Sequence, residues 1–178
     1  MSDTWEIIKA TLCEEFADFL DPAQTTRLVL RLTLAAFLGG LLGLEREQSG
    51  KAAGIRTHML VALGSALFVL IPSMMGVGST DLSRVIQGLV TGIGFLGAGT
   101  IIKGHDLNHV KGLTTAAGIW LTAAIGMAAG SGREMAAIFC TLLALSIFFL
   151  LPRILPLNDQ PSTKSDDISS YGIKACLR

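Results

Sequence analysis

Apolar residues occupy five long segments of this chain, with short polar connections between them. The segments cover about residues 28–44, 58–75, 85–102, 113–129 and 135–151, and each has 17 or 18 residues. Flanking residues can extend each segment toward the roughly 20 that a hydrocarbon core about 30 Å thick requires. A soluble helical protein would show a polar face along each segment, and these segments hardly have one. The pattern therefore predicts an all-α integral membrane bundle of five transmembrane helices.

The segment at 85–102 allows two interpretations because it is rich in glycine, with Gly88, Gly92, Gly94, Gly97 and Gly99. One continuous helix is compatible with these residues, since transmembrane helices tolerate glycine. A broken or re-entrant helix is the alternative, provided that its irregular backbone is buried in protein or lines a cavity. The sequence of this segment leaves both forms open.

An amphipathic helix is predicted before the first apolar segment. Residues 3–20 place five large apolar side chains on one helical face: Trp5, Ile8, Leu12, Phe16 and Phe19. This pattern is typical of a helix that lies at a membrane surface. Asp21 and Pro22 follow, and they indicate a helix start with Asp as the N-cap and Pro in the first turn.

The chain divides into three regions on this evidence: an amphipathic segment at 1–21, a membrane domain at 22–155 and a polar tail at 156–178. The last eight residues of the tail alternate between apolar and polar positions, as a half-buried strand does. One strand cannot be stable alone. Either the tail is disordered here, or it is the start of a further domain.

Composition agrees with a membrane protein. The chain has 178 residues, of which 51% are hydrophobic and only 16% are charged, and its net charge is zero. A soluble domain carries about 25% charged residues. The values disfavour a disordered chain, and the zero net charge disfavours a nucleic-acid-binding module. Cys13, Cys140 and Cys176 show no metal or redox spacing. With five spans they fall on one side of the membrane, within it and on the other side, so we expect no disulfide within the chain.

Basic residues are distributed unequally over the connections. One side of the expected bundle receives four of them: Lys9, Arg27, Arg84 and Arg133. The other side receives nine: Arg46, Lys51, Arg56, Lys103, Lys111, Arg153, Lys164, Lys174 and Arg178. Because Lys and Arg accumulate in cytoplasmic connections, we expect the amino terminus outside and the carboxyl terminus in the cytoplasm.

The first cytoplasmic connection holds the densest group of candidate functional residues. Glu45, Arg46 and Glu47 close the first span, and Arg56, Thr57 and His58 open the second. Acidic residues contribute little to topology, so their presence favours a functional or fold-defining network. The alternative is an ordinary cluster of interfacial charges. The second cytoplasmic connection carries Lys103, His105, Asp106, His109 and Lys111.

Two sets of residues in these connections are candidate metal ligands. His105 and His109 are four residues apart, which would place them on one helix face for a transition metal. Glu45, Glu47 and Asp106 could supply oxygen ligands to Mg²⁺ if the two connections meet. No nucleophile–base pair, phosphate loop or zinc-protease helix is present in the sequence. We therefore expect no enzymatic activity and no cofactor.

Several residues inside the spans are further candidates. Arg31 either snorkels to the outer interface or pairs inside the bundle. Gln87 and Thr91 form a small polar stripe that we expect to face other helices, and Trp120 is expected to pack in its span. Three pairs of small residues allow close helix approach: Gly39 and Gly43, Gly88 and Gly92, and Gly126 and Gly130. These pairs serve packing within the chain or a homo-oligomer.

An internal repeat is visible at a shift of 58 residues. The shift aligns Thr33, Phe37, Leu38 and Gly39 with Thr91, Phe95, Leu96 and Gly97, and it aligns Gly54 and Thr57 with Gly112 and Thr115. The first two spans would then correspond to the third and fourth. Such a repeat is parallel, because both copies cross the membrane in the same direction. Chance matches in apolar sequence are the alternative.

Two motifs resemble the MgtC/SapB family. The first is Gly43-Leu44-Glu45-Arg46-Glu47 followed by Gly54-Ile55-Arg56-Thr57-His58-Met59-Leu60-Val61. The second is Gly92-Ile93-Gly94-Phe95-Leu96-Gly97-Ala98-Gly99 followed by Lys111-Gly112-Leu113-Thr114-Thr115-Ala116-Ala117-Gly118-Ile119-Trp120. Together they extend over about residues 37–130. The candidate residues Lys111, Thr114, Thr115 and Trp120 belong to the second motif, and Lys103 belongs to the connection between its two parts.

The resemblance implies a bacterial inner-membrane protein with five spans. It further implies a role in growth under magnesium limitation and in survival inside macrophages, exerted by regulating membrane complexes such as ATP synthase and hence the membrane potential. A magnesium or other cation transporter or channel is the alternative function. Long members of the family continue into a cytoplasmic ACT-like domain, whereas this chain ends at Arg178. The expected partners are the lipid bilayer and another membrane protein.

Overall fold

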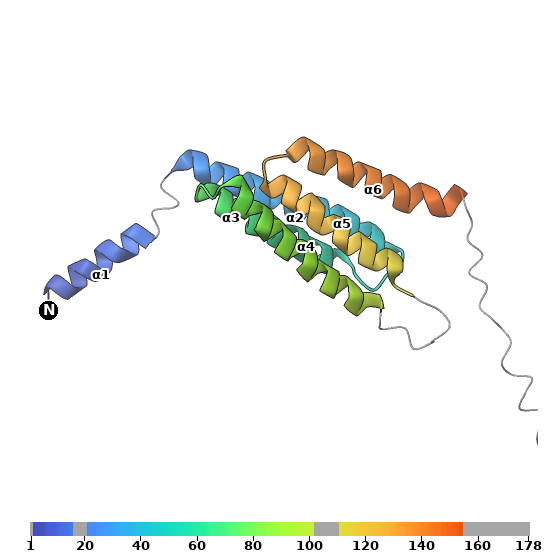
Figure 1. The fold of residues 1–178 in the computed structure, drawn as a ribbon, viewed down its shortest axis with the longest axis horizontal. Helices are drawn as coiled ribbons and strands as arrows, with labels where there is room; N and C mark the ends of the chain where they lie inside the picture. Colours follow the sequence, from blue (N-terminus) through green and yellow to red (C-terminus); the bar gives the residue numbers. More distant parts are fainter. Residues whose placement is uncertain (1, 16–20, 102–110, 155–178) are drawn as a thin grey trace, which may run out of the picture.

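The computed structural model describes residues 2–15, 21–101 and 111–154, and in these residues it contains six α-helices and no strand. The helices are α1 (Ser2–Glu15), α2 (Pro22–Gln48), α3 (Ile55–Met74), α4 (Ser79–Ile101), α5 (Leu113–Gly130) and α6 (Glu134–Ile154) (Figure 1). Helices α2 to α6 are each long and apolar enough to cross a membrane. The predicted all-α bundle with five spans is confirmed, and the chain is a multi-pass membrane protein.

The third span is one continuous helix over Ser79–Ile101, so a break within these residues is excluded. The start of α2 also follows the prediction. Asp21 is the N-cap, its Oδ1 accepts a hydrogen bond of 3.0 Å from the amide of Ala23, and Pro22 occupies the first turn. Helix α1 lies apart from the bundle (Figure 1), with Trp5, Ile8 and Leu12 exposed. Phe16, Phe19 and the tail at 156–178 lie outside the described residues.

Helix α3 packs between α2 and α5, and glycine makes both contacts close. A Cβ atom at Gly39 of α2 would lie 2.6 Å from the carbonyl oxygen of His58, and one at Gly43 would lie 2.6 Å from Cα of Ile55. On the other side of α3, Cβ atoms at Gly126 and Gly130 would overlap the backbone of Ala62 and Ala66. Backbones this close gain dispersion contacts that larger side chains would prevent. The glycine pairs in α2 and α5 therefore serve packing within the chain.

The two proposed repeat units make the same contact between their helices. Gly39 of α2 lies against His58 of α3, and Gly97 of α4 lies against Ala116 of α5, where a Cβ atom would be 3.5 Å from the alanine Cβ. Both pairs are related by the shift of 58 residues. The α2–α3 hairpin therefore packs in the same manner as the α4–α5 hairpin, although the second contact is looser. This correspondence supports the parallel repeat.

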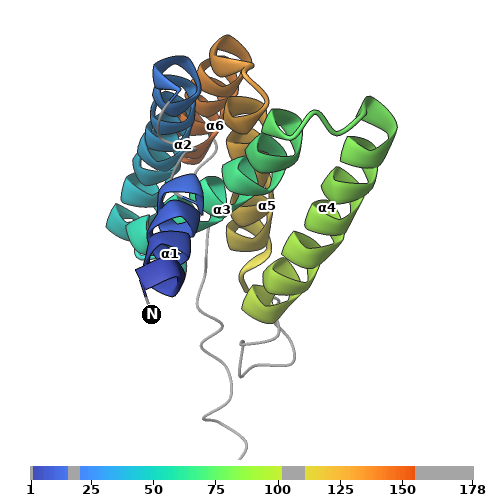
Figure 2. The same ribbon diagram turned by 90° about the vertical axis from the view of Figure 1, so that its left-hand side faces the viewer.

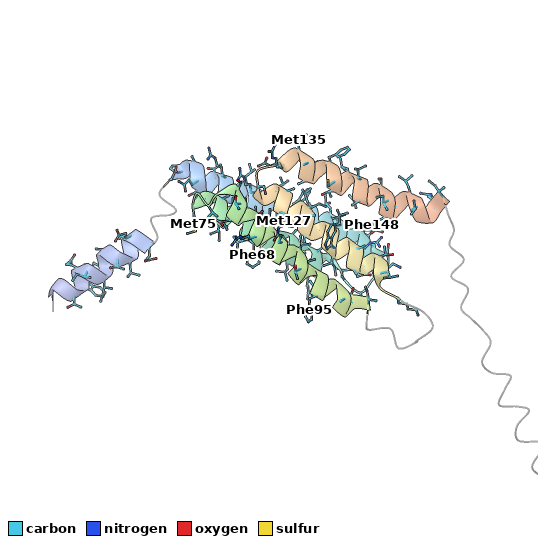
Figure 3. The ribbon with its side chains drawn as sticks, viewed as in Figure 1. Phe68, Met75, Phe95, Met127, Met135 and Phe148 are labelled. Carbon is cyan, nitrogen blue, oxygen red and sulfur yellow. The ribbon has the colours of Figure 1, made fainter. Side chains whose placement is uncertain are left out.

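Helix α4 lies at the edge of the bundle (Figure 2), and Gly97 is its only buried residue. Cβ atoms at Gly88, Gly92, Gly94 and Gly99 would meet nothing within 4 Å. Phe95 is 85% exposed and points away from the bundle (Figure 3). The Gly88–Gly92 pair therefore has the spacing of a packing motif but packs against none of the described residues.

The position of Trp120 differs from the one predicted from the sequence. It was expected to pack inside its span, but half of its surface is exposed on the outer side of α5. The reason is that the inner side of α5 is taken by smaller residues, including Thr122, Gly126 and Gly130, which allow α3 to approach. A large ring on that side would hold the two helices apart.

Candidate functional site at the α2–α3 hairpin

The first group of candidate residues comes together where α2 ends and α3 begins. We call this group the hairpin cluster and define it as Glu45, Arg46, Glu47, Gly54 and His58. Gly39 and Gly43 bring the two helices into backbone contact here, so residues on either side of the connection are neighbours. The network predicted from the sequence is therefore present, and the structure shows which of its members are buried.

Arg46 is the buried charge of the cluster. Only 4% of its surface is exposed, and its Nε donates a hydrogen bond to the carboxylate of Glu45. The other oxygen of Glu45 accepts a bond of 2.8 Å from the hydroxyl of Ser49. The guanidinium group also lies 3.7 Å from the centre of the Phe148 ring of α6. An ion pair and a cation–π contact together compensate the desolvation of this arginine.

Glu47 caps the amino terminus of α3. Its Oε2 accepts a hydrogen bond of 2.9 Å from the amide of Ile55, the first residue of that helix. The N-cap residue, Gly54, has no side chain for this purpose. A Cβ atom at Gly54 would lie only 2.5 Å from the same Oε2 atom. Gly54 and Glu47 thus act together, because the glycine leaves the space that the capping carboxylate fills.

Replacing Glu47 with Ala should weaken the hairpin by about 1 kcal/mol, the usual cost of losing a helix cap. Glu47→Gln keeps an acceptor oxygen, so it should lower the stability of the hairpin by less than half as much. Unfolding in mixed detergent–SDS micelles, followed by circular dichroism, measures both values. Equal losses in the two variants would show that the charge of Glu47 matters rather than its bond to Ile55.

His58 belongs to α3, is fully buried, and faces α5. Its Nδ1 lies 3.0 Å from the carbonyl oxygen of Gly54. A carbonyl oxygen can only accept, so Nδ1 carries the proton of the neutral ring and Nε2 holds a lone pair. Nε2 has no hydrogen-bond partner among the described residues. It faces Gly118 of α5, where a Cβ atom would lie 3.7 Å away.

The remaining members of the two motifs are less enclosed. Arg56 is exposed and Thr57 is partly buried. In the second motif, Lys111 and Thr114 are exposed and Thr115 is buried. Lys103, His105, Asp106 and His109 lie outside the described residues. Arg56 and Arg46 looked alike in the sequence, but only Arg46 is enclosed by the fold.

Two of the three candidate magnesium ligands, Glu45 and Glu47, lie in the hairpin cluster, whereas the third, Asp106, lies outside the described residues. The carboxylates of Glu45 and Glu47 are each engaged by protein donors. The described part of the chain contains no group of three His, Cys, Asp or Glu side chains that could hold a metal ion. Their observed role is to stabilise the connection between α2 and α3.

Arg31 forms a second polar contact at the opposite end of the bundle. Its Nε lies 3.4 Å from Oε1 of Glu134 in α6, and its Nη1 donates a bond of 3.3 Å to the carbonyl oxygen of Gly130 in α5. Arg31 therefore pairs with other helices, and it does so at the end of the bundle, where both charged side chains are partly exposed. Arg31 ties α2 to the turn that joins α5 and α6.

We expect Arg31→Leu and Glu134→Leu each to destabilise the bundle by about 1 kcal/mol, because the pair is partly exposed and such pairs contribute little. In a double-mutant cycle, the two substitutions should be less than additive by about 0.5–1 kcal/mol. Thermal unfolding in detergent measures the cycle. Full additivity would mean that the observed contact contributes nothing.

Gln87 and Thr91 face outward rather than toward the other helices of the chain. Both residues are exposed, and the hydroxyl of Thr91 bonds back to the carbonyl oxygen of Gln87 at 2.9 Å. The expectation that they would face neighbouring helices is wrong for this chain by itself. The cause is that α4 packs on α5 and α3 through another side, where Gly97 lies against Ala116 of α5.

Comparison with known proteins adds to this picture. The profile of the MgtC family matches residues 32–156. The chain is 45% identical over 139 residues to the "Putative magnesium transporter YhiD" of Escherichia coli (strain K12), covering 72% of this chain and 63% of that protein. It is 44% identical over 150 residues to "Protein SrpB" of Synechococcus elongatus, covering 76% and 82% of the two chains.

"Protein MgtC" of Brucella abortus is 43% identical over 117 residues, which make up 66% of this chain and 48% of that protein. The chain thus spans less than two thirds of the Escherichia coli relative and about half of the Brucella one. No solved structure shows significant similarity to it. Both the hairpin cluster and α4 lie inside the matched region.

Proposed function

Since the chain belongs to the MgtC family, we propose that it is a non-enzymatic protein of the bacterial inner membrane that regulates another membrane complex. The amino terminus would lie outside, and the hairpin cluster would lie on the cytoplasmic side. The complex would be one that sets the membrane potential, such as ATP synthase. The physiological setting would be adaptation to low magnesium and, in a pathogen, survival inside macrophages.

The observation that carries this proposal is the outer face of α4. It presents Gln87 and Thr91 together with Gly88 and Gly92, and all four are exposed. In hydrocarbon an amide without a partner is costly, and small residues leave room for another helix to approach closely. This face therefore suits contact with a transmembrane helix of a partner protein or of a second copy. Gly39, Gly43, Gly126 and Gly130 are already used within the chain.

Site-specific photo-crosslinking in native membranes tests the proposal. A photoreactive residue at position 87 or 91 of α4 should give one discrete protein adduct. The matched control is position 142 of α6, since Leu142 is 59% exposed on another outer surface. We expect no discrete adduct from position 142. Adducts of equal yield from both helices, or from neither, would contradict a partner surface on α4.

The alternative function is a magnesium or other cation transporter, as the name "Putative magnesium transporter YhiD" suggests for that protein. The buried polar side chains favour the regulator over this alternative. The six buried polar or charged side chains of the described residues are Arg46, His58, Ser65, Thr115, Thr122 and Thr141, and the hydroxyls of Thr122 and Thr141 bond to carbonyl oxygens of their own helices. A cation route would need a row of oxygen ligands across the bundle, and no Asp or Glu is among these buried side chains.

A further inference from the structure

A groove runs between α5 and α6 at the end of the bundle that carries the hairpin cluster. The volume of the groove is about 430 Å³, and its lining is mainly apolar, with Leu113, Thr114, Gly118, Leu121, Ile147 and Phe148. The two helices meet at their connecting turn and separate toward this end (Figure 1). Leu113 and Ile147 are exposed on the outer surface. The groove is therefore accessible from the bilayer.

The mouth of the groove is positively polarised. Helix α5 begins there, after Gly112 in a left-handed conformation with φ of +95°, and no side chain of this N-cap residue bonds to the helix amides. Lys111 is exposed next to it, and Thr114, the second residue of the helix, lines the groove. Free amide groups at a helix start attract anions. Charge and hydroxyl donors thus gather where the apolar groove begins.

A buried polar atom lies behind the wall of the groove. Nε2 of His58 has no partner among the described residues, and it points at Gly118. A Cβ atom at Gly118 would lie 3.7 Å from this nitrogen and 3.5 Å from Cζ of Phe148. Only a glycine and the edge of one ring therefore separate the imidazole from the groove. The charged groups nearest to it, Arg46 and Glu45, already pair with each other.

We propose that this groove binds an anionic glycerophospholipid from the surrounding leaflet. The phosphate lies at the start of α5, beside Lys111 and Thr114, and one acyl chain fills the apolar part between α5 and α6. The glycerol and ester region then reaches the level of Gly118, in front of the buried ring of His58. Basic mouths between transmembrane helices suit anionic headgroups in this way, and the complementary charge favours a lipid over an apolar helix.

Lipid retention by the purified full chain tests the headgroup part of the proposal. Native mass spectrometry would compare palmitoyl-oleoyl phosphatidylglycerol with the phosphatidylcholine that carries the same acyl chains. We expect severalfold greater retention of phosphatidylglycerol, and we expect Lys111→Gln/Thr114→Val to abolish this preference. Lys51→Gln removes an exposed lysine of the other connection and should leave it unchanged. Equal retention of the two lipids by the unmodified chain would overturn the proposal.

The acyl-chain part needs a separate comparison. Ala117→Phe fills the groove, whereas Ala136→Phe places the same ring on an exposed position of α6 away from it. Only the first should lower retention of phosphatidylglycerol, and inorganic phosphate in excess should not displace the lipid. Displacement by inorganic phosphate, or equal retention in the two Phe variants, would overturn the proposal.

The position of the lipid in front of His58 has its own readout. In ¹⁵N spectra of the histidine-labelled chain, phosphatidylglycerol should shift the Nε2 signal of His58, because only Gly118 and the edge of the Phe148 ring lie between this nitrogen and the groove. Phosphatidylcholine should not shift this signal. An identical His58 spectrum in both lipids would contradict the proposed position.

Discussion

Gly126→Ala is expected to destabilise the bundle by about 1–3 kcal/mol, the usual range for overpacking. The added methyl group would overlap the carbonyl oxygen of Ala62 and would lie 2.9 Å from its Cα. No side-chain rotation can relieve this overlap, because the opposing atoms belong to the backbone of α3. Helices α3 and α5 would have to move apart, which would also loosen Gly130 from Ala66.

The matched control is Gly88→Ala, in a pair of the same spacing. Nothing lies within 4 Å of its added methyl group, and alanine favours a helix over glycine by up to about 1 kcal/mol. Gly88→Ala should therefore leave stability unchanged or raise it slightly. Thermal unfolding in one detergent, monitored by size-exclusion chromatography, compares the two variants. Equal destabilisation would contradict the described packing of α3 against α5.

Arg46→Ala is expected to have the largest effect of a single change in the hairpin cluster. It removes the partner of Glu45, whose side chain is only 10% exposed, and it removes the contact with Phe148. Breaking a buried pair from one side costs about 3–5 kcal/mol, because the remaining charge stays buried. The variant should fold poorly or accumulate at a low level in the membrane.

Two further variants separate the buried pair from the general charge of this connection. Arg56→Ala removes an exposed arginine of the same motif and should change stability by less than about 0.5 kcal/mol. Glu45→Gln/Arg46→Met removes both charges and should recover most of the stability lost in Arg46→Ala. Comparable losses in Arg46→Ala and Arg56→Ala would show that Arg46 is only a topological charge.

The sequence predicted the five spans because a membrane helix needs only enough consecutive apolar residues, and this requirement is local. It also predicted the start of α2, because Asp21 and Pro22 act on amides of the next turn. It predicted a network at Glu45 to His58 because the charges are close along the chain. These successes all depend on interactions between near neighbours.

The features that were missed depend on contacts between distant segments. Arg31 and Glu134 are 103 residues apart, and Arg46 and Phe148 are 102 residues apart, so neither partner could be chosen from spacing. The three glycine pairs look alike in the sequence, yet only Gly39–Gly43 and Gly126–Gly130 have a helix against them. Which face of α4 is free follows from the packing of the whole bundle.

Magnesium flux into liposomes containing the purified chain is the most direct test of the account. A regulator that acts through the outer face of α4 should give the same flux as empty liposomes at every magnesium gradient. Gly126→Ala, which disturbs the packing of α3 against α5, serves as a control for magnesium leakage caused by disturbed packing. Flux well above that of empty liposomes, lost in Gln87→Leu although the variant remains folded, would contradict the account and favour the transporter.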